Sequence, residues 1–282
     1  MARTSAISLI ESGELKADLK EIYGFVIDSV QAETLSAGLK SQAYTGDPAA
    51  GSVEFKRFAN ATSNEYGTAR GAGAGAKVKA PPVTVNLDQH REIVEEVAKF
   101  DIETFGVSNI MARRADEQVD TMVSELDVAF FEEAKEKGTA VVLDYNEDIS
   151  LVVEQLIQKL ETTKNEFVRG VPRDKINLVF NPLAYGKIRS KLDKLSNPNV
   201  NTAAERFDMF HGVKVYGSVY LPDGVDMTAM ADSAIAQPVT SDPYSEPAKI
   251  PLSNDFSVEL YFDYGTSALT PDLILTAELP TE

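Results

Sequence analysis

A run of glycines followed by a lysine forms the segment that most resembles a ligand-binding loop. Gly71 to Lys77 reads Gly-Ala-Gly-Ala-Gly-Ala-Lys. A phosphate-binding loop needs Gly-Lys-Ser/Thr at the start of a helix, and a dinucleotide-binding loop also needs a helix after its glycines. Here Val78 follows the lysine, and Pro81-Pro82 are incompatible with a helix. We therefore interpret residues 67–76 as the flexible tip of a hairpin.

The two histidines are too few for a metal site built from imidazoles. His90 stands near Glu92, Glu95 and Glu96, which leaves a mixed carboxylate site open, although this pattern is typical of a solvated strand or helix edge. His211 precedes a glycine and is interpreted as a turn residue. The absence of cysteine excludes disulfides and thiolate chemistry, and no serine lies in a nucleophile elbow. We predict no catalytic residues, no cofactor and no metal.

The net charge argues against a protein whose main task is to bind nucleic acid. Asp and Glu total 44 against 27 Lys and Arg, which gives a formal charge of −17. Such binding needs the opposite sign or a basic stripe, whereas Arg113–Arg114 and Lys187 to Lys194 are short basic groups among apolar and acidic residues. A strong negative charge keeps a concentrated protein in solution and repels DNA. The longest apolar stretches fall short of the roughly 18 residues of a membrane span, so we expect no membrane partner.

The remaining sequence predicts an α+β chain. Apolar residues at helical spacing predict a helix of about 30 residues, some 45 Å long, over Ser108–Lys137. Shorter helices are expected from Asp148 to Leu160 and from Asn181-Pro182 to about Leu195. Strands are predicted at Ile176–Phe180, Val213–Leu221, Ala229–Val239, Phe256–Asp263 and Leu273–Leu279.

The segment from Thr45 to Asp88 predicts a long two-stranded hairpin. Arms of about 15 residues reach on the order of 50 Å. An isolated ribbon of two strands is marginal in water because no second layer covers its apolar face. We therefore expect the hairpin to lie on another molecule, with its aromatic side chains as anchors.

At this point the order of elements resembles the major capsid proteins of tailed bacteriophages, which have the Hong Kong-97-like fold. The resemblance rests on Val83–Leu87 with Phe100-Asp101-Ile102, Ala115-Asp116-Glu117 and Leu126-Asp127, on Lys175–Asp193 with its Asn181-Pro182, on His211–Val215 and Tyr220-Leu221-Pro222, and on Phe256–Leu279 with Thr270-Pro271-Asp272. Together these segments cover most of residues 44–282, and their order carries the resemblance.

The resemblance implies a division into four parts. These are an N-terminal arm (1–43), an extended hairpin called the E-loop (44–92), a peripheral domain with a spine helix (93–144 and 251–269), and a mixed α/β axial domain (145–250 and 270–282). The predicted contacts between subunits are Phe55, Phe58, Tyr66, Val83, Val85, Arg113 and Arg114.

The resemblance also implies a non-enzymatic structural protein of the virion. Its hexamers and pentamers would assemble in the host cytoplasm into an icosahedral shell. The shell would enclose double-stranded DNA without sequence-specific binding. Because the arm begins almost at Met1, we expect a separate scaffolding protein rather than N-terminal cleavage, and a portal as a further partner. Lys56, Lys77 and Lys79 lie where some members crosslink, but we identify no matching asparagine or glutamate.

Two other functions stay open. An encapsulin-like compartment would share the fold and load enzyme cargo, although the sequence shows no cargo groove. An α+β enzyme that uses carboxylates belongs to a different class and would form a discrete small oligomer. Nucleic acid inside a particle would separate a phage shell from a compartment.

Overall fold

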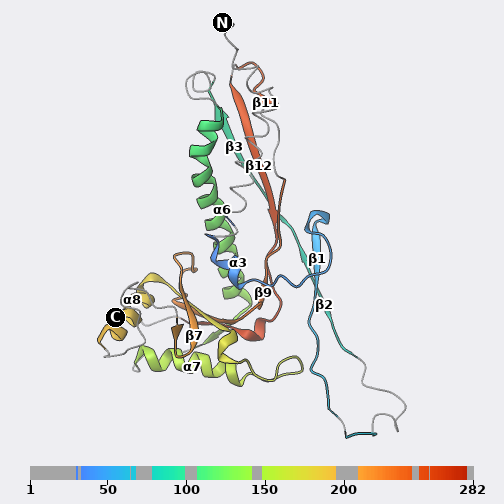
Figure 1. Ribbon diagram of the computed structural model, residues 1–282, viewed down its shortest axis with the longest axis vertical. Coiled ribbons are helices and arrows are strands. Elements are labelled where there is room, and N and C mark those ends of the chain that lie inside the picture. The colour runs from blue at the N-terminus through green and yellow to red at the C-terminus, as the bar shows by residue number, and fades with distance from the viewer. Residues whose placement is uncertain are drawn as a thin grey trace.

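The structure is a computed structural model, and it describes residue 30 and residues 33–63, 65–67, 78–98, 107–141, 148–194, 209–242, 248–253 and 255–277. The described chain is elongated, and one long helix runs along much of it (Figure 1). The principal helices are α6 (Val107–Lys137), α7 (Ile149–Thr162) and α8 (Pro182–Lys194). We call the sheet with α7 and α8 the base domain, and the strands beside the upper part of α6 the spine region.

A mixed sheet of six strands forms the centre of the base domain. Its strands lie in the order β4 (Thr139–Val141), β14 (Ile274–Ala277), β8 (Met227–Ala231), β5 (Ile176–Phe180), β7 (Val213–Gly217) and β6 (Met209–Phe210). Two neighbouring pairs, β5 with β7 and β14 with β4, are parallel, and the others are antiparallel. The expected α+β class is confirmed.

Helices cover both faces of this sheet. On one face, Leu178 and Phe180 of β5 belong to a cluster with the apolar stripes of α7 and α8. On the other face, Val179 lies in a cluster with Phe130 and Phe131 of α6. β5 is therefore buried on both sides, which explains why its sequence is almost continuously apolar.

The spine region consists of a long antiparallel ribbon beside α6. β3 (Gln89–Val97) and β12 (Phe256–Tyr264) pair along their full length. β10 (Val239–Asp242) and β11 (Ala248–Lys249) pair with β12 as well. Leu260 and Phe262 are buried whereas Tyr261 is exposed, so the alternation read from the sequence is confirmed here.

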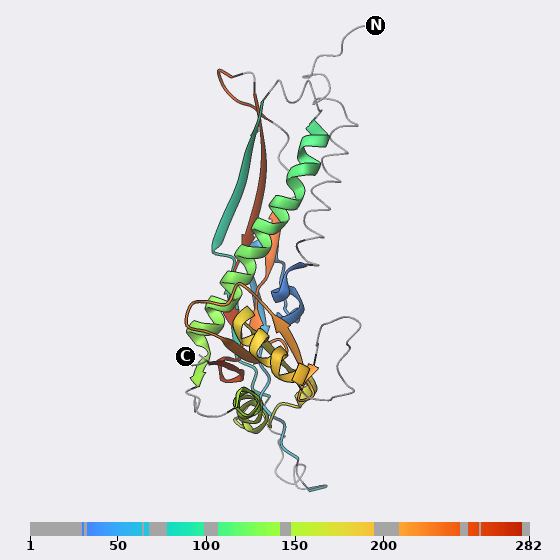
Figure 2. The ribbon, with the colours of Figure 1, turned by 90° about the vertical axis from the view of Figure 1, so that its left-hand side faces the viewer.

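Glu125 of α6 joins the helix to the ribbon. Its carboxylate accepts a hydrogen bond from the Tyr264 hydroxyl at 3.0 Å and forms an ion pair with Arg91. Burial and this carboxylate raise the pKa of Tyr264 to about 12. Figure 2 shows α6 continuing from the spine region into the base domain, so a single helix belongs to both parts.

The predicted helix starts agree with the structure, although α7 extends two residues beyond its predicted end at Leu160. Asp148 caps α7, and its Oδ1 accepts the Ser150 N–H at 3.1 Å. Asn181 precedes α8, and its Oδ1 accepts the Ala184 N–H at 2.7 Å. The long helix predicted over Ser108–Lys137 is α6.

Two of the strand predictions need correction. The strand expected over Val213–Leu221 ends at Gly217. The strand expected over Ala229–Val239 is divided into β8, β9 (Ile235–Ala236) and β10, and Ser233, with a φ of 63°, lies in the turn between β8 and β9.

The smaller elements connect these parts. They are α3 (Leu35–Leu39), β1 (Ser52–Lys56), β2 (Pro82–Asn86), β13 (Ser267–Ala268), which pairs with β9, and the 3₁₀ turns η1 (Pro48–Ala50), η2 (Arg173–Lys175) and η3 (Pro271–Leu273). No helix among the described residues is long and apolar enough to cross a membrane. Most of the predicted arm, residues 1–29, lies outside the described part of the chain.

The described end of the arm is held on α6 by a buried carboxylate. Asp127 accepts the first N–H groups of α3, from Leu35 at 3.1 Å and Ser36 at 2.9 Å. The Ser36 hydroxyl donates to Gln237, which in turn donates to the Leu126 carbonyl. Burial raises the pKa of Asp127 above its ordinary value, and the two amide bonds oppose that rise. This network fixes the arm against the helix shared by both parts.

Replacing Asp127 with alanine should release the arm, because two helix N–H groups lose their acceptor. We expect Tm to fall by roughly 4–8 °C, which corresponds to about 2 kcal/mol in a chain of this size. Differential scanning calorimetry measures the shift, and Asp120→Ala, at an exposed position of the same helix, is the matched control. Equal Tm values for the two variants would contradict the role given to Asp127.

Candidate functional site

The hairpin is anchored at its root. β1 and β2 pair antiparallel from Ser52 opposite Asn86 to Lys56 opposite Pro82. Phe55 is only 3% exposed and Val85 2%, because they pack with Ala236 and Leu269 of their own chain. This corrects the expectation that the whole hairpin lacks a second layer. It also leaves the side chains of Phe55 and Val85, two of the predicted contacts, covered within the single subunit.

A glycine permits this close packing. A Cβ on Gly265 would lie 1.8 Å from the Asn86 carbonyl oxygen, so no other residue fits there. The chain segment that follows β12 therefore passes directly against β2. The root of the hairpin is part of the folded body.

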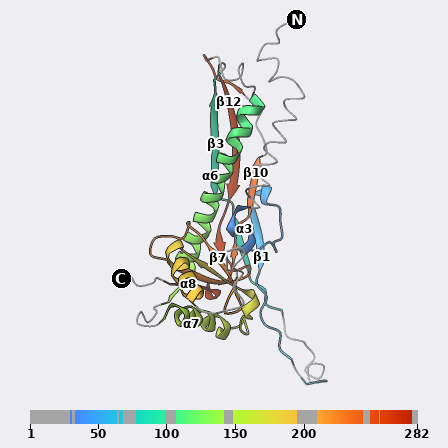
Figure 3. The same cartoon turned by 60° about the vertical axis from the view of Figure 1, so that its left-hand side comes forward.

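The outer part of the hairpin presents apolar side chains to solvent. Phe58 is 62% exposed, Tyr66 95% and Val78 80%. The two arms stay together beyond the strands, because the Ala59 N–H donates to the Lys79 carbonyl at 2.9 Å. Figure 3 shows this part extending away from the base domain. Exposed aromatic and aliphatic side chains on a projecting ribbon are typical of an interaction surface.

The other predicted contacts are placed differently. Val83 is half-buried at the root. Arg113 and Arg114 lie in the first third of α6, but their side chains fall outside what the structure describes. Residues 68–76 of the predicted tip also lie outside the described chain, and they include most of its glycines.

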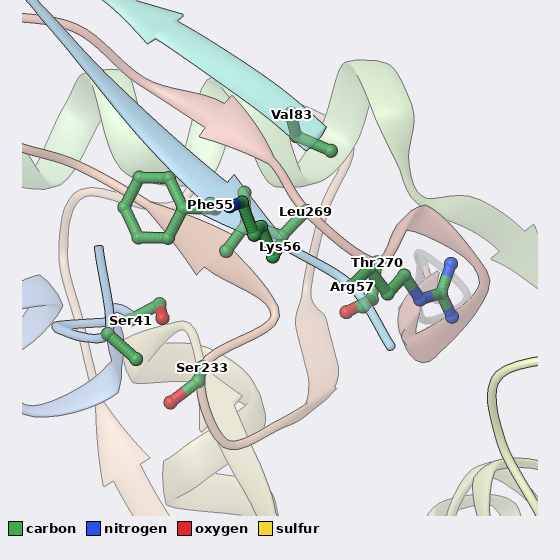
Figure 4. A pocket seen from close by; sticks show the side chains of 9 residues that line it. Ser41, Phe55, Lys56, Arg57, Val83, Ser233, Leu269 and Thr270 are labelled. Carbon is green, nitrogen blue, oxygen red and sulfur yellow. The ribbon is translucent and has the colours of Figure 1, made fainter. Parts of the chain in front are cut away.

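A small cavity lies between the hairpin root and the body. Its volume is about 170 Å³, and its lining comes from the hairpin (Phe55, Lys56, Arg57 and Val83) and from the body (Ser41, Ser233, Leu269 and Thr270), as labelled in Figure 4. Pockets for drug-sized ligands measure about 300–1,000 Å³. We therefore regard this cavity as a packing gap beneath the hairpin root.

One face of the spine ribbon is strongly acidic. The register between β3 and β12 places Glu92 opposite Tyr261 and Val94 opposite Glu259. Glu92, Val94 and Tyr261 are exposed, and His90 pairs with Asp263 at 2.8 Å on the same face. Within the described residues, no three His, Asp or Glu side chains gather as a metal site would require. The face combines negative charge with two exposed apolar side chains.

Ser150, His211 and Glu154 form a chain that resembles a catalytic triad. Ser150 Oγ lies 3.1 Å from His211 Nε2, and His211 Nδ1 lies 2.5 Å from Glu154 Oε2. A nucleophilic serine also needs free N–H donors to hold an oxyanion. The first N–H groups of α7, at Ser150 and Leu151, are bound to Asp148 instead. The geometry supports a structural link between α7 and the turn before β7.

Arg173 adds ion pairs to this link and lowers the pKa of Glu154. It forms ion pairs with Glu154 and, at 2.8 Å, with Glu161, and it donates to the His211 carbonyl at 2.9 Å. Hydrogen bonds from Arg173 lower the pKa of Glu154 to about 2, although burial acts in the opposite direction. Glu154 is therefore ionised over the whole neutral and mildly acidic range.

Superposition on solved structures shows which fold the chain has. The chain superposes on a solved structure from Mycobacterium phage Che8 with a TM-score of 0.65 at 17% identity, covering 87% of this chain and 91% of that one. It superposes on the capsid of the cyanophage P-SCSP1u with a TM-score of 0.64 at 11% identity, over 88% and 89% of the two chains. The chain has the Hong Kong-97-like capsid fold. A virus-like particle from Pyrococcus furiosus also has this fold, with a TM-score of 0.57 at 14% identity over 92% and 98%.

At the level of sequence the likeness is faint. No family model and no curated protein matches the chain. The Hong Kong-97-like fold is therefore shown by structural superposition over most of the chain.

Sequence reasoning missed one group of residues near the hairpin. The loop 163–170, between α7 and η2, contacts both hairpin arms through Asn165 and Glu166. Asn165 also donates to Asp272, which forms an ion pair with Arg57 at 2.8 Å. The available signal was an asparagine just after a helix end, which is typical of a turn closed by its own side chain.

The pKa of Glu154 predicts how stability depends on pH. A pKa lowered from 4.5 to about 2 in the folded chain contributes stability above pH 4.5, and this contribution is lost as the pH falls toward 2. Glu154→Gln should cost about 1 kcal/mol at neutral pH, discounted for partial exposure. The difference in the free energy of unfolding between Glu154→Gln and the unsubstituted chain should decrease steadily as the pH falls.

Urea unfolding at several pH values between neutral and strongly acid measures this difference. Glu132→Gln, at an exposed position of α6, is the matched control and should leave the pH profile unchanged. A constant difference between Glu154→Gln and the unsubstituted chain at every pH would show that the ionised form has no special partner.

Proposed function

We propose that this chain is the major capsid protein of a tailed bacteriophage. Many copies assemble into an icosahedral shell around double-stranded DNA, and the protein belongs to the virion. The observation that carries the proposal is the Hong Kong-97-like fold together with a projecting hairpin that exposes Phe58 and Val78. A subunit that keeps apolar anchors in water on an extended ribbon is built to meet another subunit.

In this proposal the four expected parts have structural counterparts. The arm ends in α3, β1 and β2 form the root of the E-loop, the spine region is the peripheral domain, and the base domain is the axial domain. Axial domains gather around the symmetry axes of hexamers and pentamers. The negative charge of −17 suits a wall that encloses DNA without adsorbing it.

The hairpin of one subunit overlies the peripheral domain of its neighbour. The acidic face of the spine ribbon, with Glu92, Glu96 and Glu259, complements exposed lysines of the hairpin such as Lys56. The exposed Val94 and Tyr261 provide apolar area within that face. Each contact is weak, and closure of many identical contacts makes the shell stable. A separate scaffolding protein and a portal complete the proposed assembly.

A compartment shell is the second candidate, because the particle from Pyrococcus furiosus matches 98% of its own length. The two candidates differ in content. Particles purified from the cells that naturally produce this chain should contain DNA in the first case, and protein cargo without DNA in the second. A small oligomer of fixed size and no particles would contradict both.

Deleting residues 67–76 should leave a folded subunit that no longer forms shells, because the E-loop loses its reach. Negative-stain electron microscopy of the expressed protein measures particle formation, and circular dichroism checks the fold. Normal particles from the deletion variant would count against the proposal.

A replacement of equal length is the matched control for this deletion. The segment 67–76 consists mostly of glycine and alanine, so a Gly-Ser sequence of the same length keeps its reach and removes few side-chain contacts. We expect this replacement variant to form shells. The pair separates the length of the tip from its chemistry.

Replacing Phe58 and Val78 together with serine should weaken assembly without destabilising the subunit. Both side chains are exposed in the single chain, so Tm should change by less than about 2 °C. The protein concentration needed for particles, measured by light scattering, should rise about tenfold or more. Thr62→Ala, on the same arm, controls for changes of exposed polar residues. Unchanged assembly would exclude these two side chains as anchors.

A further inference from the structure

The hairpin touches its own base domain at a second place, beyond the anchored root. The Asn60 N–H donates to the Glu166 carbonyl at 2.9 Å, and its side-chain amide donates to the Asn165 carbonyl at 3.1 Å. On the returning arm, Lys79 Nζ lies 2.7 Å from the Glu166 carboxylate. A single residue, Glu166, therefore binds the outgoing arm through its backbone and the returning arm through its side chain.

The loop that makes these contacts is preformed. Asn165 Oδ1 accepts the N–H groups of Phe167 and Val168, each at 2.8 Å, and so closes a tight turn. Gly170 ends the loop with a φ of 110°, where a Cβ would lie 2.7 Å from the Glu161 carbonyl oxygen. The loop holds its shape through its own bonds, and the hairpin rests on it.

Arg57 and Asp272 tie this loop to the hairpin more firmly. The Arg57 guanidinium lies 4.5 Å from the centre of the Phe167 ring and 2.8 Å from Asp272 Oδ2. Asp272 also accepts the Asn165 side-chain amide. One carboxylate thus anchors both the hairpin and the loop, and it is itself held in η3 next to β14.

We propose that the loop 163–170, together with Asp272, is a clasp that fixes the direction in which the hairpin leaves its subunit before any neighbour is present. A ribbon of two strands bends easily, and a hairpin free to swing would lose more entropy when it docks. The clasp removes part of that loss in advance. The single contacts are polar and partly exposed, so each is weak, and the hairpin direction depends on the set. Asp272 is a positioning residue, since it acts through Arg57 and Asn165.

The role of the clasp in docking depends on the proposed function of the hairpin. The clasp itself can be tested in one unassembled subunit. Two neighbouring amides report on different bonds. The Asn60 N–H bonds across the clasp to Glu166, whereas the Ala59 N–H bonds within the hairpin to Lys79. Hydrogen exchange at single-residue resolution on the unassembled full-length chain therefore distinguishes an open clasp from an unzipped hairpin.

Asp272→Ala removes the shared anchor. We expect the Asn60 amide to exchange about tenfold faster while the Ala59 amide keeps its rate. Asp174→Ala, in the exposed 3₁₀ turn η2, is the matched control and should change neither amide. Equal acceleration of both amides in Asp272→Ala, or of neither, overturns the clasp.

Particle formation by Asp272→Ala is a separate readout. An open clasp with slower assembly supports both the clasp and its role in docking. If the Asn60 and Ala59 amides exchange as expected but the unsubstituted chain itself never forms particles, the clasp stands and the proposed shell function is contradicted. The two conclusions therefore fail independently.

Discussion

A ribbon of two strands can bury an apolar side chain only against whatever lies beneath it, and this limit governs the hairpin of the present chain. At the root, Ala236 and Leu269 lie beneath Phe55 and Val85, and these side chains leave the solvent. Farther out, Phe58 and Val78 remain in water. The same hairpin is thus part of the subunit core at one end and an exposed surface at the other. In the proposed shell, assembly is the step that would take these exposed side chains out of the solvent.

The long helix makes the two parts of the molecule one mechanical unit. The lower half of α6 contributes Phe130 and Phe131 to the base domain, and Glu125 above them binds the spine ribbon. Asp127 in the same stretch holds the arm. A displacement of the spine region therefore reaches the base sheet and the arm through one rigid element.

Sequence patterns sufficed for elements whose signals are local. The periodicity of α6, the Asp148 cap and the Asn181-Pro182 start all carry their information within a few residues. The burial of Phe55 could not be predicted this way, because its partners Ala236 and Leu269 lie far along the chain.

The same limit applies to turns and to the clasp. Ser233 interrupts an apolar run with a positive φ, which could not be predicted because serine rarely adopts this conformation. The clasp is built from ordinary polar residues that come together only when α7 and η3 take their places. Its contacts are set by tertiary structure, so a pattern search within the sequence has nothing to detect.

The position of β3 at the rim of its sheet has a consequence for aggregation. Within the described residues β3 pairs with β12 alone, which leaves its other side as the rim of the sheet. An exposed rim offers unpaired backbone groups to any passing strand and invites irregular fibres. Arg91, Glu92, Glu95 and Glu96 place charge along much of this strand. This charge disfavours strand-by-strand addition of one copy to another, so in the proposed shell the copies would associate through other surfaces.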